Sequence, residues 1–368
     1  MVKIAYLATT FDVSRESGVL KKIISQMKTW ISQGHEVEMF VLNPQGGIWE
    51  GVRKNSLIFN SFVYNTSISG LFAWHSMLKA IRKWYPDIIY YRSGVYYPSF
   101  KALACMFPIV AEINSYDVVE YKMFLSQAKY FYHRVTRKML FAPCAGLVCV
   151  TNELANRYSC FDKPTVVIAN GIDLANYAPL LPTNNEVPRL VFLGSPGHPW
   201  HGIDKIIMLA RLCPEFNFDV IGYNANDVPY NGQMPSNIKF HGLLNSNEYA
   251  SLLAKSDVAI GTLSLHVKNM NEASPLKIRE YLAHGLPVII GYKDTDFPNG
   301  ASFLLELPNC EDNIINNVQL VKAFVCQWKG RRVPRDEVLH IDASRKEASR
   351  LAFLNQVLDY CCLKHKKV

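Results

Sequence analysis

Two glutamates eight positions apart, Glu272 and Glu280, are the residues whose types and spacing best suit catalysis or ligand binding. They lie in the stretch Asn271 to Gly291, NEASPLKIREYLAHGLPVIIG. Ser274 and Pro275 between them fit a helix start, with Ser as N-cap and Pro at the first helical position. A helix N-terminus offers unpaired N–H groups and the positive end of a dipole, which suits an anion such as a diphosphate. We therefore expect one glutamate beside that anion site, facing a sugar, and the other about two turns along, within reach of a ribose.

The surrounding pattern predicts the elements that hold these glutamates. Apolar residues recur at helical spacing up to Gly285, which ends the helix, and PVII from Pro287 reads as a short buried strand. This periodicity also fits an ordinary helix–strand unit with two solvated glutamates. Periodicity alone does not distinguish that unit from a ligand site.

Length and composition indicate a globular protein of two domains. The chain has 368 residues, of which 49% are hydrophobic and 19% charged. It contains no apolar run long enough to span a membrane, and its first residues read as a strand rather than a secretory signal. Nine scattered cysteines without metal-ligand CxxC pairs favour reduced thiols in a cytoplasmic protein.

The net charge of +8 is unevenly distributed. Residues 1–174 contain 19 Lys and Arg against 12 Asp and Glu, whereas residues 175–368 contain 20 against 19. A basic N-terminal half favours anionic substrates or an anionic membrane surface. No recognition motif supports nucleic acid as a partner.

The N-terminal half, residues 1–175, alternates strand-like and helical stretches, which predicts a parallel sheet covered on both faces. A loop from Thr9 to Gly18 follows the first strand, at the sheet edge where such folds bind ligands. The loop lacks GxGxxG, so Gly18 is interpreted either as a close approach for phosphate or substrate or as a plain turn glycine. Polar residues at another strand end are candidates for lining a cleft or binding an acceptor: Glu112, Asn114 and Ser115.

A basic, aromatic segment from Lys129 to Leu140, KYFYHRVTRKML, has the composition of an interfacial amphipathic helix. The alternative is an ordinary domain helix with a solvated basic face. Binding to liposomes that depends on anionic lipid would distinguish the interfacial helix from the ordinary domain helix.

The second half repeats the pattern of the first. Residues 176–188 are rich in proline and read as a linker, residues 189–343 form a second α/β series, and residues 344–368 form a final helix. The predicted fold class is therefore α/β, with two Rossmann-like domains whose parallel sheets face each other across a cleft.

Taken together, these residues resemble the retaining nucleotide-sugar glycosyltransferases of the GT-B type, particularly family 4. The resemblance covers almost the whole chain and rests on ordered pieces: Gly18, NGID from Asn170, VFLG from Val191, WHGIDK from Trp200, GLL from Gly242, and the glutamate stretch with HGLPVI behind it.

The resemblance implies specific roles. Glu272 would contact the donor sugar as the catalytic candidate, and Glu280 would bind the ribose hydroxyls. Peptide N–H groups at Ser274, Lys277 and Ile278 would hold the diphosphate. The base would lie near Tyr223, Leu243 and Leu244. The last helix would pack back on the first domain.

Two departures from the family pattern change the expectations. Ser195 and His201 stand near the positions where the family has the Arg and Lys that hold the diphosphate, so Lys277 or Lys205 is expected to supply positive charge. Asn114 stands where the family often has a histidine, so a histidine-based role there is not expected.

These implications together predict transfer of a sugar from a nucleotide diphosphate donor, of UDP or GDP type, to an acceptor hydroxyl with retention at the anomeric carbon. We expect no cofactor and no metal, since the only DxD-like triplet, Asp294 to Asp296, lies beyond the glutamate stretch and is interpreted as chance. The expected acceptor is a glycan or lipid-linked glycan in cell-surface polysaccharide synthesis, and the expected location is the cytoplasm, with peripheral attachment to the inner face of the membrane. Two alternatives are a nucleotide-sugar 2-epimerase and a binding protein that has lost catalysis.

Overall fold

The chain divides into two compact units. The computed structural model describes residues 1–9, 11–14, 17–228, 230 and 232–365, so part of the predicted loop from Thr9 to Gly18 and the last residues of the predicted tail lie outside the described residues. Unit 1 comprises Met1–Gly171 and Ala343–Val368, and unit 2 comprises Ile172–Asp342. The stretch 176–188, predicted as a linker, falls within unit 2. There the Leu180 N–H donates to the His284 carbonyl (3.0 Å).

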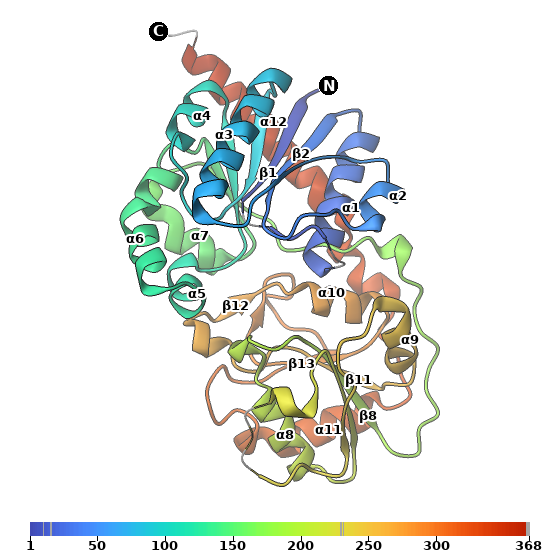
Figure 1. The fold of residues 1–368 in the computed structure, drawn as a ribbon. Helices are drawn as coiled ribbons and strands as arrows, with labels where there is room; N and C mark the ends of the chain where they lie inside the picture. Colours follow the sequence, from blue (N-terminus) through green and yellow to red (C-terminus); the bar gives the residue numbers. More distant parts are fainter. Residues whose placement is uncertain (10, 15–16, 229, 231, 366–368) are drawn as a thin grey trace. The chain divides into compact units, whose positions relative to one another are not determined.

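Unit 1 is built on a seven-stranded parallel sheet with the order β3-β2-β1-β4-β5-β6-β7 (Figure 1). Apolar runs such as IIYYR are buried on both faces, as expected for strands covered by helices on each side. The strands are β1 Lys3–Ala8, β2 Glu36–Asn43, β3 Ile58–Val63, β4 Ile88–Arg92, β5 Ile109–Ile113, β6 Gly146–Cys149 and β7 Thr165–Val167. The helices are α1 Gly18–Ser32, α2 Glu50–Lys54, α3 Ser67–Trp84, α4 Phe100–Met106, α5 Asp117–Phe124, α6 Gln127–Phe141, α7 Asn152–Tyr158, the 3-10 turn η1 Ser159–Phe161 and α12 Ala343–His365.

The C-terminal helix α12 completes the core of unit 1. It packs beside α1 against one face of the sheet, and Figure 1 draws it in red beside the blue first strands. Its Leu351, Phe353, Leu354 and Val357 join side chains of β1 and α1 in one buried cluster. A methyl group added at Gly146 on β6 would lie 3.0 Å from Phe353, so helix and sheet are in direct contact.

Unit 2 contains a six-stranded parallel sheet with the order β10-β9-β8-β11-β13-β15 and a separate two-stranded pair, β12 with β14. Together the two parallel sheets and their helices confirm the predicted α/β class. The strands are β8 Arg189–Leu193, β9 Asn217–Ile221, β10 Ile238–Phe240, β11 Val258–Ile260, β12 Glu272–Ala273, β13 Val288–Ile290, β14 Lys293–Asp294 and β15 Leu304–Glu306. The helices are α8 Ile203–Leu212, α9 Ser246–Ala254, α10 Leu276–Ala283 and α11 Val318–Trp328. The 3-10 turns are η2 Leu174–Asn176, η3 Pro199–His201, η4 Ala225–Asp227, η5 Leu265–Lys268, η6 Ile315–Asn317 and η7 Arg335–Ile341.

Helix α10 begins one residue later than the sequence pattern predicted. Pro275 has extended backbone angles (φ −73°, ψ 140°) and occupies the N-cap position, and its side chain makes no capping hydrogen bond. The prediction of Ser274 as N-cap is therefore wrong, because its hydroxyl accepts a hydrogen bond from the Arg279 guanidinium instead (2.8 Å). Gly285 ends the helix with a positive φ of 77°, as predicted.

Candidate functional site

The end of strand β8 is the centre around which the predicted donor-site residues of unit 2 gather. The backbone N–H of Leu193 donates to the buried Tyr281 hydroxyl of α10 (2.6 Å), which ties this strand end to the helix. The Phe192 ring lies 4.3 Å from the Lys277 ammonium and 5.6 Å, between ring centroids, from His201. The strand thus brings residues from α10 and from the following loop to one aromatic side chain.

Lys277, in the first turn of α10, carries a buried ammonium group. Its Nζ is enclosed and has no hydrogen-bond partner among the described residues. Burial lowers the pKa of this ammonium to about 7. A buried cation with unfilled donors is costly unless something pairs with it. Its place beside the free N–H groups of a helix N-terminus makes an anion the natural partner.

His201 is buried and neutral. Its Nδ1 lies 3.1 Å from the Tyr223 hydroxyl, and its ring stacks on His198 at 5.1 Å between centroids. Burial, followed by the charge of Lys277, lowers the pKa of His201 far below its usual range. His201 therefore adds hydrogen-bonding capacity near the Lys277 ammonium but no positive charge.

The loop after β8 passes very close to the end of β9. A methyl group at Gly222, where φ is 90°, would lie 1.9 Å from the Gly194 carbonyl oxygen, so only glycine fits. Ser195, half-buried, follows directly in this loop. The two glycines therefore hold the loop that carries Ser195 and His201 against the sheet.

The residues predicted to hold the base meet at the ends of β9 and β10. Gly222 N–H donates to the Gly242 carbonyl (2.7 Å) and Gly242 N–H donates to the Tyr223 carbonyl (2.9 Å). Tyr223 is buried, Leu244 is half-buried and Leu243 is 85% exposed. The structure thus brings Tyr223 and the Leu243–Leu244 pair to one strand edge, and Leu243 leaves its side chain uncovered.

The two glutamates occupy different elements. Glu272 lies in β12, which pairs in parallel with β14, and its side chain is half-buried. Glu280, in the second turn of α10, accepts a hydrogen bond from the Tyr249 hydroxyl (2.7 Å). That contact orients the Glu280 carboxylate and leaves its remaining lone pairs for a ligand hydroxyl. Ile278, also predicted for the phosphate site, has a fully buried side chain, and its N–H donates to the Pro275 carbonyl (3.2 Å).

Arg279 is the residue that sequence reasoning missed. Its guanidinium has no exposed surface and makes a bidentate contact with Asp294 (2.9 and 2.8 Å), with a further ion pair to Asp296 (3.0 Å). It also donates to the Ser274 hydroxyl (2.8 Å). The triplet Asp294 to Asp296 is therefore not a chance occurrence: it anchors α10 and the turn before it to strand β14. The paired aspartates Asp294 and Asp296 were the available signal in the sequence, because two acidic residues near a buried arginine are its natural partners.

Lys205 does not fit its predicted role as a diphosphate ligand. Its side chain is buried, and its ammonium donates to the carbonyl oxygens of Cys310 (2.7 Å) and Leu263 (3.4 Å). The Glu311 carboxylate lies 3.8 Å away. Lys205 therefore connects α8 to two loops through hydrogen bonds. Of the two lysines predicted for the phosphate site, Lys277 remains as the candidate cation.

Gly18 and Ser115 are accessible in unit 1. Gly18 is the first residue of α1 and is exposed, and the Ser17 hydroxyl before it caps the helix by accepting from the Leu20 N–H (3.1 Å). Ser115, half-buried, follows β5 by two residues. Both positions remain predictions as contacts for a substrate.

Glu112 is a buried structural anion, which corrects its prediction as a residue that lines a cleft. It has no exposed surface and accepts hydrogen bonds from Lys22 (2.8 Å), Tyr90 (3.0 Å), Arg92 (3.2 Å) and Asn114 (2.9 Å). These contacts, led by the charge of Lys22, hold the pKa of Glu112 well below its usual range despite burial. Asn114 also accepts from Lys22 (3.3 Å), so it is held by the same contacts, although its side chain stays half-buried.

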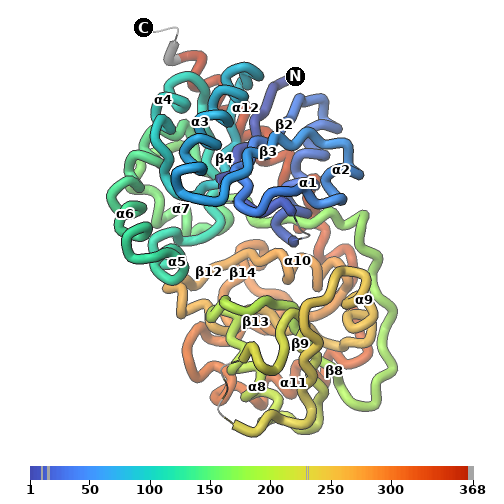
Figure 2. Tube along the Cα trace, viewed as in Figure 1, coloured from blue at the N-terminus to red at the C-terminus, as the bar shows by residue number. Residues whose placement is uncertain are grey.

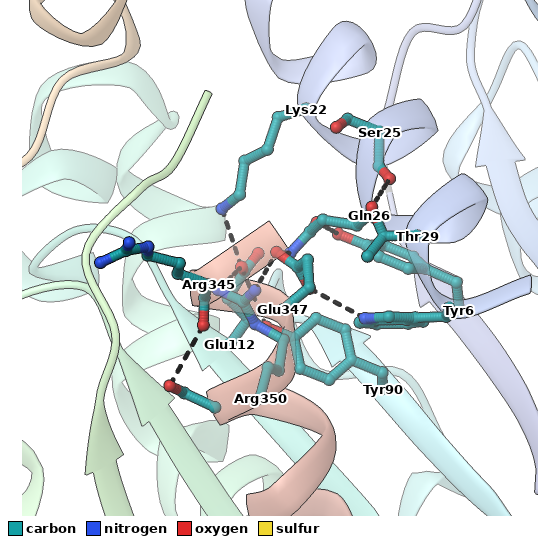
Figure 3. A network of polar contacts seen from close by, with 12 residues as sticks. Tyr6, Lys22, Ser25, Gln26, Thr29, Tyr90, Glu112, Arg345, Glu347 and Arg350 are labelled. Carbon is teal, nitrogen blue, oxygen red and sulfur yellow. Dashed lines mark hydrogen bonds and ion pairs between the residues drawn. The ribbon is translucent and has the colours of Figure 1, made fainter. Parts of the chain in front are cut away.

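The network around Glu112 extends into α12. Figure 3 draws Arg350 together with Glu112 and Glu347. The Arg350 Nη2 lies 4.0 Å from the Glu112 Oε1, and the Arg350 guanidinium forms an ion pair with Glu347. Glu347 in turn accepts from Trp30 (2.8 Å) and Gln26 (3.3 Å) of α1. The cluster is structural: its hydrogen bonds and ion pairs hold α1, β5 and α12 to one another.

Among the described residues, no group of three or more His, Cys, Asp or Glu side chains could hold a metal ion. No described helix is both long enough and apolar enough to cross a membrane.

Comparison with known proteins gives matches of family and fold. The family model for Glycosyltransferase Family 4 matches residues 18–176. No curated protein sequence matches the chain significantly. Among solved structures, the lipopolysaccharide outer core galactosyltransferase WaaB in its apo form is similar at a TM-score of 0.65 and 9% identity, covering 97% of this chain and 99% of that one.

Two further structures match over the full length. A sucrose-phosphate synthase from Thermosynechococcus elongatus has a TM-score of 0.61 and 14% identity, with 99% of this chain and 98% of that one covered. HepE from Anabaena, solved with UDP and glucose, has a TM-score of 0.57 and 14% identity, with both chains covered completely. This chain has the GT-B fold. The predicted resemblance to family 4 glycosyltransferases is matched by the family model over residues 18–176, and the solved structures add the fold over the whole chain.

Proposed function

We propose that this GT-B protein transfers a sugar from a nucleotide diphosphate donor to an acceptor hydroxyl, with retention at the anomeric carbon. The observation that carries the proposal is the buried Lys277 ammonium in the first turn of α10, within the Glu272–Glu280 stretch. This ammonium has no hydrogen-bond partner in the part of the chain that the structure describes. A diphosphate would satisfy both this cation and the helix N-terminus. The solved complex of HepE with UDP and glucose supports a donor of this class.

The residues of unit 2 would then have distinct tasks. The diphosphate lies at Lys277 and the first N–H groups of α10, with His201 and Ser195 as neutral donors. Glu280, oriented by Tyr249, accepts from the ribose hydroxyls. Glu272 orients the donor sugar. Tyr223, Leu243 and Leu244 pack against the base.

The chemical step breaks the bond from the anomeric carbon to the diphosphate oxygen and forms one to the acceptor oxygen. The departing diphosphate takes the negative charge and accepts the acceptor proton. Fixed dipoles and the Lys277 cation stabilise that charge as it develops. The step consumes no oxidant or reductant and is proposed to need no metal, so chelation with EDTA should leave the rate unchanged.

Nucleotide binding tests the donor site. Isothermal titration with UDP and with GDP should show affinity reduced about tenfold or more in Lys277→Met, since charge-assisted hydrogen bonds contribute about 1.5–3 kcal/mol each. Lys277→Arg should keep most of the affinity. Lys239→Met is the matched control, because Lys239 is an exposed lysine of the same unit. Unchanged affinity in Lys277→Met would contradict the assignment.

Product analysis tests the reaction. The proposed acceptor is a glycan or lipid-linked glycan of cell-surface polysaccharide synthesis, in keeping with the similarity to a lipopolysaccharide galactosyltransferase. Mass spectrometry should detect a glycosylated acceptor, and NMR should show the donor's anomeric configuration in it. Conversion of the donor sugar without any acceptor would instead establish an epimerase.

A further inference from the structure

Helix α6 of unit 1 turns an apolar stripe outward, while polar and apolar side chains share its inner side. The buried residues are His133, Thr136, Leu140 and Phe141. Phe131, Val135 and Met139 are 70%, 62% and 49% exposed. These three residues are spaced by four, so they form one stripe along the helix. An amphipathic helix of a folded domain normally buries such a stripe.

Buried polar contacts fix this orientation. Asp117, at the start of α5, accepts from His133 (2.7 Å), Arg137 (2.8 Å) and the Tyr158 hydroxyl (2.7 Å). The Arg137 guanidinium also lies over the rings of Tyr158 (4.6 Å) and Phe161 (4.9 Å). Turning the apolar stripe inward would break this ion pair and leave a buried carboxylate unpaired. The outward stripe is therefore a fixed surface.

Cations surround the stripe. Lys129, Arg134 and Lys138 of α6 and Lys122 of α5 are exposed. Met123 and Phe124, at the end of α5, add further exposed apolar surface. Figure 2 shows α5 and α6 as consecutive green helices of unit 1, and the two helices pack together. Between residues 117 and 141, all of which the structure describes, the two acidic residues are the buried Asp117 and the half-buried Glu120.

We propose that this α5–α6 surface binds the surface of an anionic lipid bilayer. The surface comprises the exposed apolar and basic residues of the two helices: Lys122, Met123, Phe124, Lys129, Phe131, Arg134, Val135, Lys138 and Met139. Apolar side chains flanked by cations suit the boundary between acyl chains and anionic head groups. The charge complementarity selects a lipid of negative charge over a neutral one. The proposal stands independently of the transferase reaction, because binding to vesicles needs neither donor nor acceptor.

Sedimentation with vesicles tests the proposal on the full chain. The protein should pellet with vesicles of equimolar phosphatidylcholine and phosphatidylglycerol and stay in solution with phosphatidylcholine alone. Arg134→Gln with Lys138→Gln should weaken the partition by about fivefold for each charge removed. Phe131→Ser with Val135→Ser should also release the protein. Phe72→Ser is the matched control, because Phe72 of α3 is 72% exposed and far from these cations in sequence.

A second measurement locates the contact without depending on affinity. Phe131→Trp should show fluorescence quenched by brominated lipid in the anionic vesicles, and Phe72→Trp should add no quenching above the native tryptophans. Equal pelleting with neutral vesicles, unchanged binding of the Arg134/Lys138 variant, or quenching at position 72 but not 131 would each overturn the proposal.

Discussion

Lys277 makes nucleotide binding depend on pH. Burial lowers the pKa of its ammonium to about 7 in the empty site, and a bound diphosphate favours the charged form and raises that pKa. Below pH 7 the group is protonated with or without ligand. Above pH 7 binding requires uptake of a proton, so affinity should fall by up to about tenfold per pH unit until the pKa of the complex is reached.

Titration calorimetry with UDP between pH 7 and 9 measures this dependence, and buffers of different ionisation enthalpy report the proton taken up. Lys277→Arg is the sharp control, because a guanidinium stays charged throughout this range and should abolish the decline. A decline of the same size in Lys277→Arg would assign the pH dependence to another group.

Arg279 should be essential for stability. Arg279→Met leaves Asp294 and Asp296 buried without a counter-charge, which costs about 3–5 kcal/mol in comparable buried pairs. Urea titration should show this loss. Adding Asp294→Asn and Asp296→Asn to Arg279→Met should restore part of the stability, because no buried charge then remains unpaired. A triple variant less stable than the single one would contradict this account.

At the scale of elements, the sequence pattern predicted the helices and strands better than it predicted the contacts between side chains. Parallel strands and their helices follow from apolar runs and periodic faces, and β1 and the end of α10 fall where the sequence predicted them. The start of α10 does not, because a long-range hydrogen bond from Arg279 takes the Ser274 hydroxyl away from capping. Lys205 and Glu112 were misjudged for the same reason: the groups that engage them come from distant positions in the chain.

The junction of α12 with α1 depends on Glu347. Glu347→Gln removes the carboxylate that pairs with Arg350 and accepts a hydrogen bond from Trp30. We therefore expect the free energy of unfolding of unit 1 to fall by about 1–3 kcal/mol. The unfolding can be followed by intrinsic tryptophan fluorescence in urea, since Trp30 lies at the junction. Arg345→Gln, an exposed charge on the same helix, should have no comparable effect. Equal stability of the Glu347→Gln variant and the native protein would show that the network does not stabilise this junction.

At the scale of the whole molecule, the two units differ in continuity. Unit 2 is one unbroken segment, whereas unit 1 needs residues from both ends of the chain. We expect residues 172–342 expressed alone to fold cooperatively, with dispersed amide NMR signals. Residues 1–171 alone should expose the apolar surface that α12 covers and bind the dye ANS, since Leu351, Phe353, Leu354 and Val357 would be absent.

Addition of a synthetic peptide of residues 343–368 to the 1–171 fragment should suppress that dye binding. A fragment 1–171 that is already rigid and binds no dye would show that α12 is dispensable to the core of unit 1.

Because α12 belongs to unit 1, the two units complete their folding in a defined order during synthesis at the ribosome. Domains commonly fold as they emerge, with the N-terminal one first. Here the segment that completes the first unit is made after the whole of unit 2, so unit 2 can reach its final structure while unit 1 still waits for its closing helix. A ribosome stalled once residue 342 has emerged would therefore hold a finished unit 2 and an unfinished unit 1, and the emergence of α12 is the event that completes unit 1.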